Sequence, residues 1–178
     1  MQPWEIDSRA LELLEDACGF ALGAEPSGVA MLPSTAEHEI VAGDGMGGCF
    51  YRWNSQQREN RIPIIYLSSY GETSRFADDF TDALMLVTAF PWYWRDVLVA
   101  AHKGDALVER VIRGNEEDPE PEGVEARTEL SALLGLDLAA ARAKFVTAVR
   151  RTPPFAPLLA SRDGSTPARS FAARPYPG

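Results

Sequence analysis

The sequence predicts an α+β fold: a mixed, mostly antiparallel sheet of about 4–6 strands flanked by helices, with a helical C-terminal extension and a proline-rich tail. Residues 43–98 hold the densest apolar runs, the tightest glycine cluster and three of the four tryptophans. Runs with helical spacing of apolar residues precede and follow this stretch. The core is therefore expected to form around residues 43–98.

Length and composition suit one globular domain with an appendage. The chain has 178 residues, of which 46% are hydrophobic and 24% charged, and a domain of this size buries roughly two thirds of its unfolded surface. We expect residues 1–151 to form the domain, and residues 152–178, with six prolines, to form an extended or disordered tail. No run approaches the ~20 apolar residues of a membrane span, and Cys18 and Cys49 are too far apart for a CxxC site, which together predict a cytoplasmic protein with buried free thiols.

The formal net charge of −9 is unevenly distributed. Residues 1–50 carry nine acids against Arg9 alone, whereas residues 151–178 carry four arginines against Asp163. An acidic surface repels phosphate backbones, which argues against direct binding of nucleic acid. A basic protein partner is the electrostatically favoured one, and the alternative is that the acids serve solubility alone.

The N-terminal third predicts one helix and two short strands. Asp7 or Ser8 is expected to cap the helix, and Gly19 and Gly23 mark its end. Residues 29–32 and 38–42 have the pattern of brief strands. The apolar positions of the helix that recur at helical spacing are Ala10, Leu11, Leu14, Ala17 and Cys18.

The glycine cluster 43–48 satisfies GxGxxG, the fingerprint of dinucleotide-binding loops. That fingerprint requires a following helix whose N-terminus meets the phosphate. Here the cluster leads into residues 49–53, which alternate from side to side like a strand. We therefore expect a tight turn with glycines at positive φ, and no cofactor.

Residues 54–90 predict two further strands and a helix. Residues 54–61 form a polar connection, and the continuous apolar run 62–67 is typical of a central strand covered on both faces. Residues 74–77 suit one more short strand. Asp78 or Asp79 is then expected to cap a helix over residues 80–90.

Pro91 is expected at the first position of a new helix, with Trp94, Val97, Leu98 and Ala101 on its inner face. Trp92 and Tyr93 cannot lie on the same inner face. Each is therefore either exposed or buried under a neighbouring helix or the tail, and burial is the favoured alternative. Helices are expected over residues 105–113, 125–134 and 137–151. Residues 115–123, with five acids, read as a solvated linker. On the last helix the inner stripe is Leu138, Ala141, Phe145 and Ala148.

The chain lacks the usual catalytic motifs. His38-Glu39 opens like HExxH, but alanine occupies position 42, so the second metal ligand is missing. There is neither a GxSxG elbow nor a GxxxxGK[ST] loop. We predict no metal and no enzymatic activity; the alternative is a hydrolase whose carboxylates are brought together by folding.

Four segments in a fixed order resemble the SUKH (SMI1/KNR4) superfamily. They are the turn Gly43–Gly48 followed by Phe50, the run Ile62–Ser69, the pair Gly71-Glu72, and Asp79-Phe80 with a helix that ends at Pro91-Trp92. Together they cover about a third of the chain. The sequence departs from the family at Tyr70, where an acidic residue is common, and from about Asp105 onward, where no counterpart is found.

The resemblance implies an α+β fold without catalytic activity. It further implies a bacterial immunity protein that binds a cognate toxin, often a nuclease or deaminase domain. A regulatory scaffold that binds a cellular protein or small ligand is the alternative within the same family. Our hypothesis for the partner-binding residues combines acids with one aromatic anchor: Asp44, Glu72, Asp78, Asp82 and Trp92.

Overall fold

The structure is a computed structural model that describes residues 6–24, 30–31, 38–53, 62–70, 72–151, 160–161 and 169–170. The helices are α1 (Ser8–Asp16), α2 (Phe80–Ala89), α3 (Trp94–Ala101), α4 (Asp105–Glu117), α5 (Pro121–Leu133) and α6 (Ala141–Val149), with a 3-10 turn, η3 (Leu138–Ala140). The strands are β1 (Ala21–Leu22), β2 (Ala30–Met31), β3 (His38–Gly43), β4 (Cys49–Trp53), β5 (Ile64–Leu67), β6 (Glu72–Ala77), β7 (Ala160–Ser161) and β8 (Arg169–Ser170).

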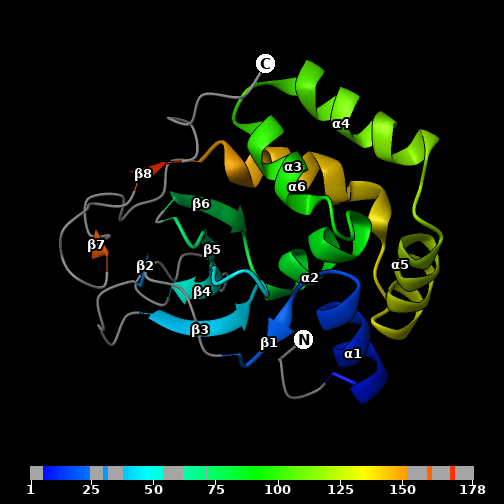
Figure 1. Ribbon diagram of the computed structural model, residues 1–178, viewed down its shortest axis with the longest axis horizontal. Coiled ribbons are helices and arrows are strands. Elements are labelled where there is room, and N and C mark those ends of the chain that lie inside the picture. The colour runs from blue at the N-terminus through cyan, green and yellow to red at the C-terminus, as the bar shows by residue number, and fades with distance from the viewer. Residues whose placement is uncertain are drawn as a thin grey trace.

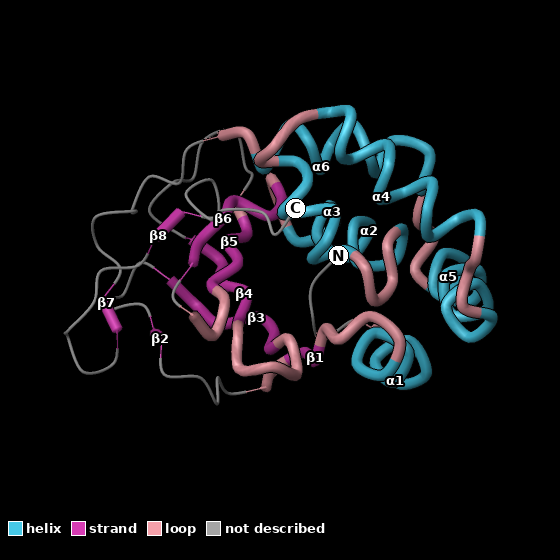
Figure 2. Tube along the Cα trace, turned by 45° about the horizontal axis from the view of Figure 1, so that its top comes forward, coloured by secondary structure: helices cyan, strands magenta, loops and turns pink. Residues whose placement is uncertain are grey.

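The fold is α+β, as predicted, with the strands gathered on one side of the molecule and the helices on the other (Figures 1 and 2). The main sheet has the order β1-β3-β4-β5-β6-β8. All its pairs are antiparallel except β6 with β8, which is parallel. β2 and β7 form a separate antiparallel pair. The predicted mixed, mostly antiparallel sheet is confirmed.

The apolar run at residues 62–67 forms a central strand, as predicted. All four residues of β5 are buried, and β5 lies between β4 and β6. Leu67 is opposite both Cys49 of β4 and Thr73 of β6. The turn that joins β3 to β4 and the turn that joins β5 to β6 therefore lie at the same edge of the sheet.

Trp94 lies where the helices meet the sheet. Its ring centroid is 5.3 Å from that of Phe50, 5.1 Å from that of Tyr66 and 5.4 Å from that of Phe76. Its Nε1–H donates a hydrogen bond of 2.9 Å to the backbone carbonyl of Cys18. The side chains of α3 that were predicted to face inward are all buried: Trp94, Val97, Leu98 and Ala101.

Aspartates cap the first two helices. Asp7 caps α1 by accepting a hydrogen bond from the backbone N–H of Arg9, and Asp79 caps α2 by accepting one from Asp82. Caps of this kind stabilise a helix by about 1 kcal/mol. The predicted inner face of α1 is buried at Ala10, Leu14, Ala17 and Cys18. Only Leu11 was wrong: it is 36% exposed, and Leu13, three residues after Ala10, is buried instead.

Three predicted helix boundaries near the prolines were wrong. α3 begins at Trp94 rather than Pro91, and residues 91–93 form a turn. α4 continues to Glu117 and α5 begins at Pro121, so the predicted linker 115–123 shrinks to residues 118–120. Pro119 disfavours helical geometry at the residue before it, whereas Pro121 is accommodated in the first turn of α5.

Some sequence predictions fall outside the described residues. The connection 54–61 lies outside them, and so does the tail from 152 apart from β7 and β8. Of the strand predicted at 29–32, only Ala30–Met31 is described, as β2. Within the described residues, the helices are all too short or too polar to cross a membrane.

We predict that Trp94→Phe lowers the free energy of unfolding by about 2–4 kcal/mol. The substitution removes buried volume from the aromatic cluster and leaves the buried carbonyl of Cys18 without its donor. Urea denaturation followed by circular dichroism measures the change. Met46→Leu, at a residue that is 69% exposed, is the control and should stay within about 0.5 kcal/mol of the parent.

Candidate functional site

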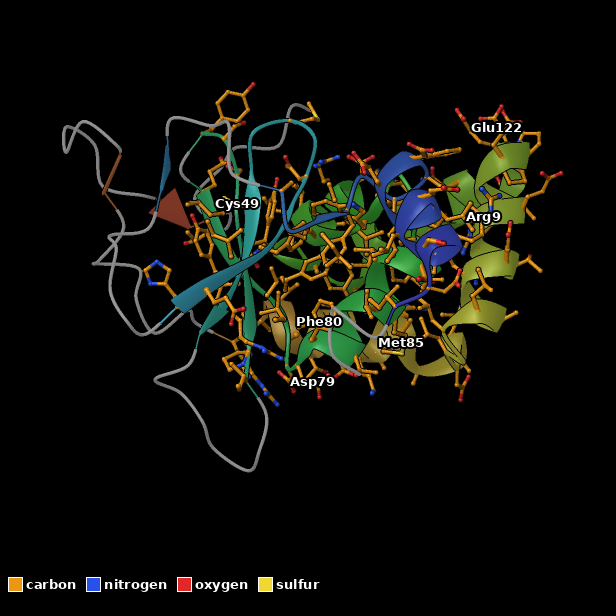
Figure 3. The ribbon with its side chains drawn as sticks, turned by 90° about the horizontal axis from the view of Figure 1, so that it is seen from below. Arg9, Cys49, Asp79, Phe80, Met85 and Glu122 are labelled. Atoms are coloured by element: carbon orange, nitrogen blue, oxygen red, sulfur yellow. The ribbon has the colours of Figure 1, made fainter. Side chains whose placement is uncertain are left out.

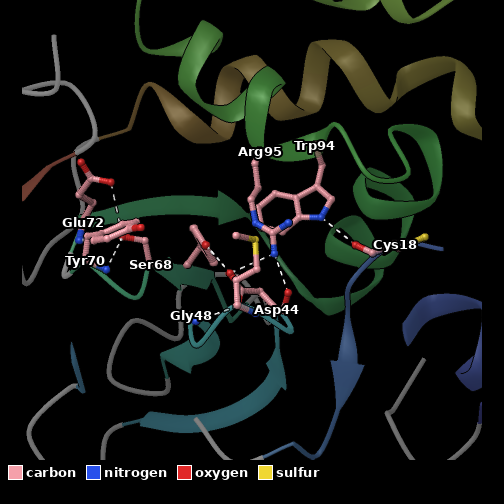
Figure 4. A network of polar contacts seen from close by, with 10 residues as sticks. Cys18, Asp44, Gly48, Ser68, Tyr70, Glu72, Trp94 and Arg95 are labelled. Atoms are coloured by element: carbon pink, nitrogen blue, oxygen red, sulfur yellow. Dashed lines mark hydrogen bonds and ion pairs between the residues drawn. The ribbon is translucent and has the colours of Figure 1, made fainter. Parts of the chain in front are cut away.

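The carboxylate of Asp44 is the centre of a polar network in the turn between β3 and β4 (Figure 4). Its Oδ1 accepts hydrogen bonds from the backbone N–H groups of Met46, at 2.8 Å, and Gly48, at 2.7 Å. Its Oδ2 accepts a hydrogen bond of 2.6 Å from the hydroxyl of Tyr66 and lies 3.1 Å from the guanidinium of Arg95. Arg95 also donates to the backbone carbonyl of Asp44.

This network closes the glycine turn. Gly45 and Gly47 have φ of 71° and 88°, as the sequence predicted. A Cβ on Gly48 would lie 2.6 Å from Oδ2 of Asp44, so only glycine fits there. The backbone donors that a phosphate would need are committed to the Asp44 carboxylate. The turn then enters strand β4, as predicted, in place of the helix that a dinucleotide-binding loop requires.

Asp44 was predicted to contact a partner, and the structure corrects this. Only 3% of the residue is exposed. Burial by itself raises the pKa of Asp44, but the hydrogen bonds from Tyr66, Met46 and Gly48 and the charge of Arg95 more than offset it, and the net pKa lies below the ordinary 3.8. The carboxylate is therefore an ionised structural group within the turn.

The turn between β5 and β6 lies at the same edge of the sheet and is also held by a side chain. The hydroxyl oxygen of Ser68 accepts hydrogen bonds from the backbone N–H groups of Tyr70 and Glu72. Glu72 is partly exposed, and Tyr70 is 79% exposed. In the neighbouring turn Met46 is 69% exposed. This edge thus presents two large apolar side chains on turns fixed by hydrogen bonds.

Asp78 and Asp82 lie at the opposite edge, where β6 leads into α2. Asp78 forms ion pairs with Arg75, at 3.0 Å, and with Arg151, at 2.8 Å. Asp82 is buried and pairs with Lys144 of α6 at 2.6 Å. Both carboxylates already form ion pairs with basic groups of the same chain. Asp82 was predicted to contact a partner, but like Asp44 it is too buried to do so.

The structure does not bring the five predicted partner-binding residues together. Asp44 and Glu72 lie at one edge of the sheet, while Asp78 and Asp82 lie at the other. Successive residues of a strand advance by about 3.3 Å, so Glu72 and Asp78 are separated by the full length of strand β6. Trp92 belongs to a third location, among the helices.

Trp92 is partly covered by a neighbouring helix, so the cover that the sequence favoured is present only in part. A Cβ on Gly123 of α5 would lie 3.0 Å from Cζ3 of Trp92, and Nε1–H of Trp92 donates a hydrogen bond of 3.3 Å to the backbone carbonyl of Asp16. Its φ is 62°, a left-handed conformation that costs a residue with a side chain about 1–2 kcal/mol. Tyr93 is likewise half-buried, with its ring centroid 5.8 Å from that of Phe90.

A groove of about 490 Å³ lies beside Trp92, and we call it the α3–α5 groove. The turn before α3 forms one side of it, and the end of α4 and the start of α5 form the other. Its volume falls in the range of binding pockets, about 300–1,000 Å³. Its lining includes Trp92, Tyr93, Asp96, Glu116, Glu120 and Arg127.

The α3–α5 groove brings together three acids that are not neutralised by a base of the described residues. Within the described part of the chain, no ion pair includes Asp96, Glu116 or Glu120. Arg127 is the one basic residue of the lining, so the acids exceed the bases there by two, three minus one. Several acids elsewhere do meet bases: Glu129 meets Arg9, Glu109 meets Arg142, Asp105 meets Arg150 and Asp82 meets Lys144. Other exposed acids, such as Glu122 and Glu125 of α5, form no ion pair within the described residues.

The end of α4 adds to this negative field. A helix C-terminus carries a partial negative charge, which favours basic residues in the last turn. The last turn of α4 has none, and it ends on Glu116 and Glu117. This feature was not predicted from the sequence, because these acids were assigned to a linker. Acids at a helix end without compensating bases are the signal that would have identified it.

No group of three histidine, cysteine, aspartate or glutamate side chains that could hold a metal ion occurs among the described residues. His38 contacts the ring of Tyr51 edge-on, with centroids 5.4 Å apart. The acids of the α3–α5 groove come from α3, α4 and the turn before α5, and do not converge on one point in the manner of a metal site.

Comparisons of the chain with protein-family models, with curated proteins and with solved structures find no significant match.

We predict that Gly123→Ala and Gly114→Ala have opposite effects on stability, although both glycines lie within helices. An added Cβ at Gly123 presses on the ring of Trp92, whereas at Gly114 it meets no heavy atom of the described residues within 4 Å. Gly114→Ala should raise the free energy of unfolding by about 0.5–1 kcal/mol through helix propensity. Gly123→Ala should lower it by about 1–2 kcal/mol through overpacking.

Thermal and urea unfolding of both glycine variants check this prediction, with tryptophan fluorescence as a probe of the ring. Equal stabilisation by the two substitutions would show that Trp92 does not press on α5 in solution.

We also predict that Asp44→Asn lowers the free energy of unfolding at pH 7 by about 2–3 kcal/mol, because it leaves Arg95 facing an uncharged amide in a largely buried site. The pKa of Asp44 is lower in the folded state than in the unfolded state, so its contribution is complete above the unfolded value of about 3.8 and is lost as the pH falls through the folded value. The difference between parent and variant should therefore shrink below about pH 4.

Urea unfolding of both proteins from pH 7 down to about pH 2.5 measures this difference. Burial lowers the pKa of His102 to about 4, which destabilises both proteins between pH 6.5 and 4 and cancels in the comparison. A difference that is already absent at pH 7 would contradict the role given to Asp44.

Proposed function

We propose that the chain is a non-enzymatic protein-binding module, an immunity protein that binds and neutralises a basic toxin domain of nuclease or deaminase type. The observation that carries the proposal is the α3–α5 groove, where three acids that pair with no base of the described residues lie beside two aromatic side chains. Nucleic-acid enzymes need a positive surface to hold their substrate. A negative partner is steered towards that surface and covers it.

The SUKH resemblance of the sequence supports the same proposal. The glycine turn Gly43–Gly48 leads into β4, Ile64–Leu67 forms the neighbouring strand β5, Glu72 begins β6, and Asp79 caps α2. We propose the cytoplasm as the place of action. The free, buried thiols of Cys18 and Cys49 support this, since such thiols are at home in a reducing compartment.

A regulatory scaffold is the second candidate. The volume of the α3–α5 groove, about 490 Å³, also suits a small organic cation, and the exposed Met46 and Tyr70 suit a cellular protein with an apolar contact surface. A scaffold of this kind would bind its ligand without protecting a cell from any toxin.

Co-expression tests the proposed function. The chain is expressed in a bacterial host together with each toxin-like gene from its own locus, and growth is scored with and without the chain. We expect one toxin to be neutralised, and we expect the protein to co-purify with it. Trp94→Phe, which weakens the fold, is the control for dependence on the folded domain. Growth arrest that persists with every toxin, while the protein is folded and abundant, contradicts the immunity function.

A further inference from the structure

The α3–α5 groove offers an incoming group both charge and aromatic surface. Asp96 extends from α3, Glu116 from the last turn of α4 and Glu120 from the turn before α5. These carboxylates approach the groove from three elements, and none is neutralised by an ion pair in the described residues. A cation in the groove would meet the negative end of the α4 dipole, while the N-terminus of α5 at the same groove carries a partial positive charge that Glu120 and Glu122 offset.

The aromatic side of the groove is fixed before any ligand arrives. The ring of Trp92 rests against Gly123 of α5 and is tied to α1 by its hydrogen bond to Asp16. The ring of Tyr93 packs edge-on against Phe90. A wall that is ordered in advance lowers the entropy cost of binding.

Arginine suits this combination better than lysine does. Its guanidinium is planar, stacks on aromatic faces and presents five N–H donors to acceptors that lie in different directions. The chain itself contains one such arrangement. The guanidinium of Arg95 lies 4.5 Å from the centre of the Trp94 ring, 3.1 Å from a carboxylate oxygen of Asp44 and 2.6 Å from its backbone carbonyl.

We propose that the α3–α5 groove receives an arginine side chain from an extended segment of the partner, between Trp92 and Tyr93 on one side and Glu116 and Glu120 on the other. This inference rests on the proposed function, because it takes the partner to be a basic polypeptide. It assigns the contact to the part of the chain from Pro91 to Arg127, and not to the edge of the sheet.

The test uses the full chain and a short probe, N-acetyl glycyl-arginyl-glycine amide, observed by nuclear magnetic resonance of the ¹⁵N-labelled protein. The sequence has four tryptophans, and Trp92→Phe identifies the indole N–H signal of Trp92. We expect the arginine peptide to shift this signal saturably. The lysine analogue should bind about fivefold more weakly, and the uncharged citrulline analogue should give no shift.

Two matched double variants separate the groove from the general negative charge. Glu116→Gln with Glu120→Gln removes two acids of the lining and should weaken binding about tenfold. Glu122→Gln with Glu125→Gln removes the same charge from exposed positions of α5 outside the lining (Figure 3 labels Glu122) and should change binding by less than about twofold. Equal losses in the two variants, binding of the citrulline peptide, or shifts that spare Trp92 would each overturn the proposal.

Repeating the rescue of growth with the same variants distinguishes the two proposals. If a toxin is neutralised equally well by the parent and by the Glu116→Gln, Glu120→Gln variant, the chain is an immunity protein that uses another surface, and the inference on the groove is wrong. If the peptide binds as expected but no toxin is neutralised, the proposal that the groove binds arginine is supported and the proposed immunity function is wrong.

Discussion

The ion pair between the buried Asp44 carboxylate and the Arg95 guanidinium joins the two layers of the fold. Asp44 belongs to the turn between β3 and β4, and Arg95 belongs to α3, which packs on the sheet through the adjacent Trp94. The pair therefore fixes the start of α3 relative to the edge of the sheet. Since Trp92 and Asp96 flank this start, one side of the α3–α5 groove depends on the same contact.

Much of the fold was predictable because its signals are local. The apolar run at residues 62–67 can be read as a buried strand from its own composition, and Asp79 can be read as a cap from the helix that follows it. The signals around Pro119 and Pro121 were read together as one break. Each proline acts on a different helix: Pro119 follows the end of α4, and Pro121 lies in the first turn of α5. The two effects can be told apart only when it is known that three residues separate the helices.

The site was much less predictable, since it depends on residues that are distant in sequence. An aspartate in a glycine-rich turn is by default a solvated group, and Asp44 is buried only because Tyr66 and Arg95 bring their donors to it. Trp92 was recognised as unusual, but its cover comes from α5, which begins 29 residues later. The two sides of the groove are residues 91–96 and 115–127, and no periodic pattern connects them.

Features that cost stability gather at the α3–α5 groove. Trp92 holds a left-handed backbone conformation, Gly123 weakens the first turn of α5, and Glu116 and Glu117 oppose the dipole of α4. By contrast, the first two helices obey the local rules, since Asp7 and Asp79 cap them through hydrogen bonds from the backbone. Sequences that favour stability alone do not concentrate such exceptions in one place. A ligand that contacts both the acids and the aromatic wall would explain why these features occur together. The free energy of binding that ligand would offset the stability that these features cost the fold.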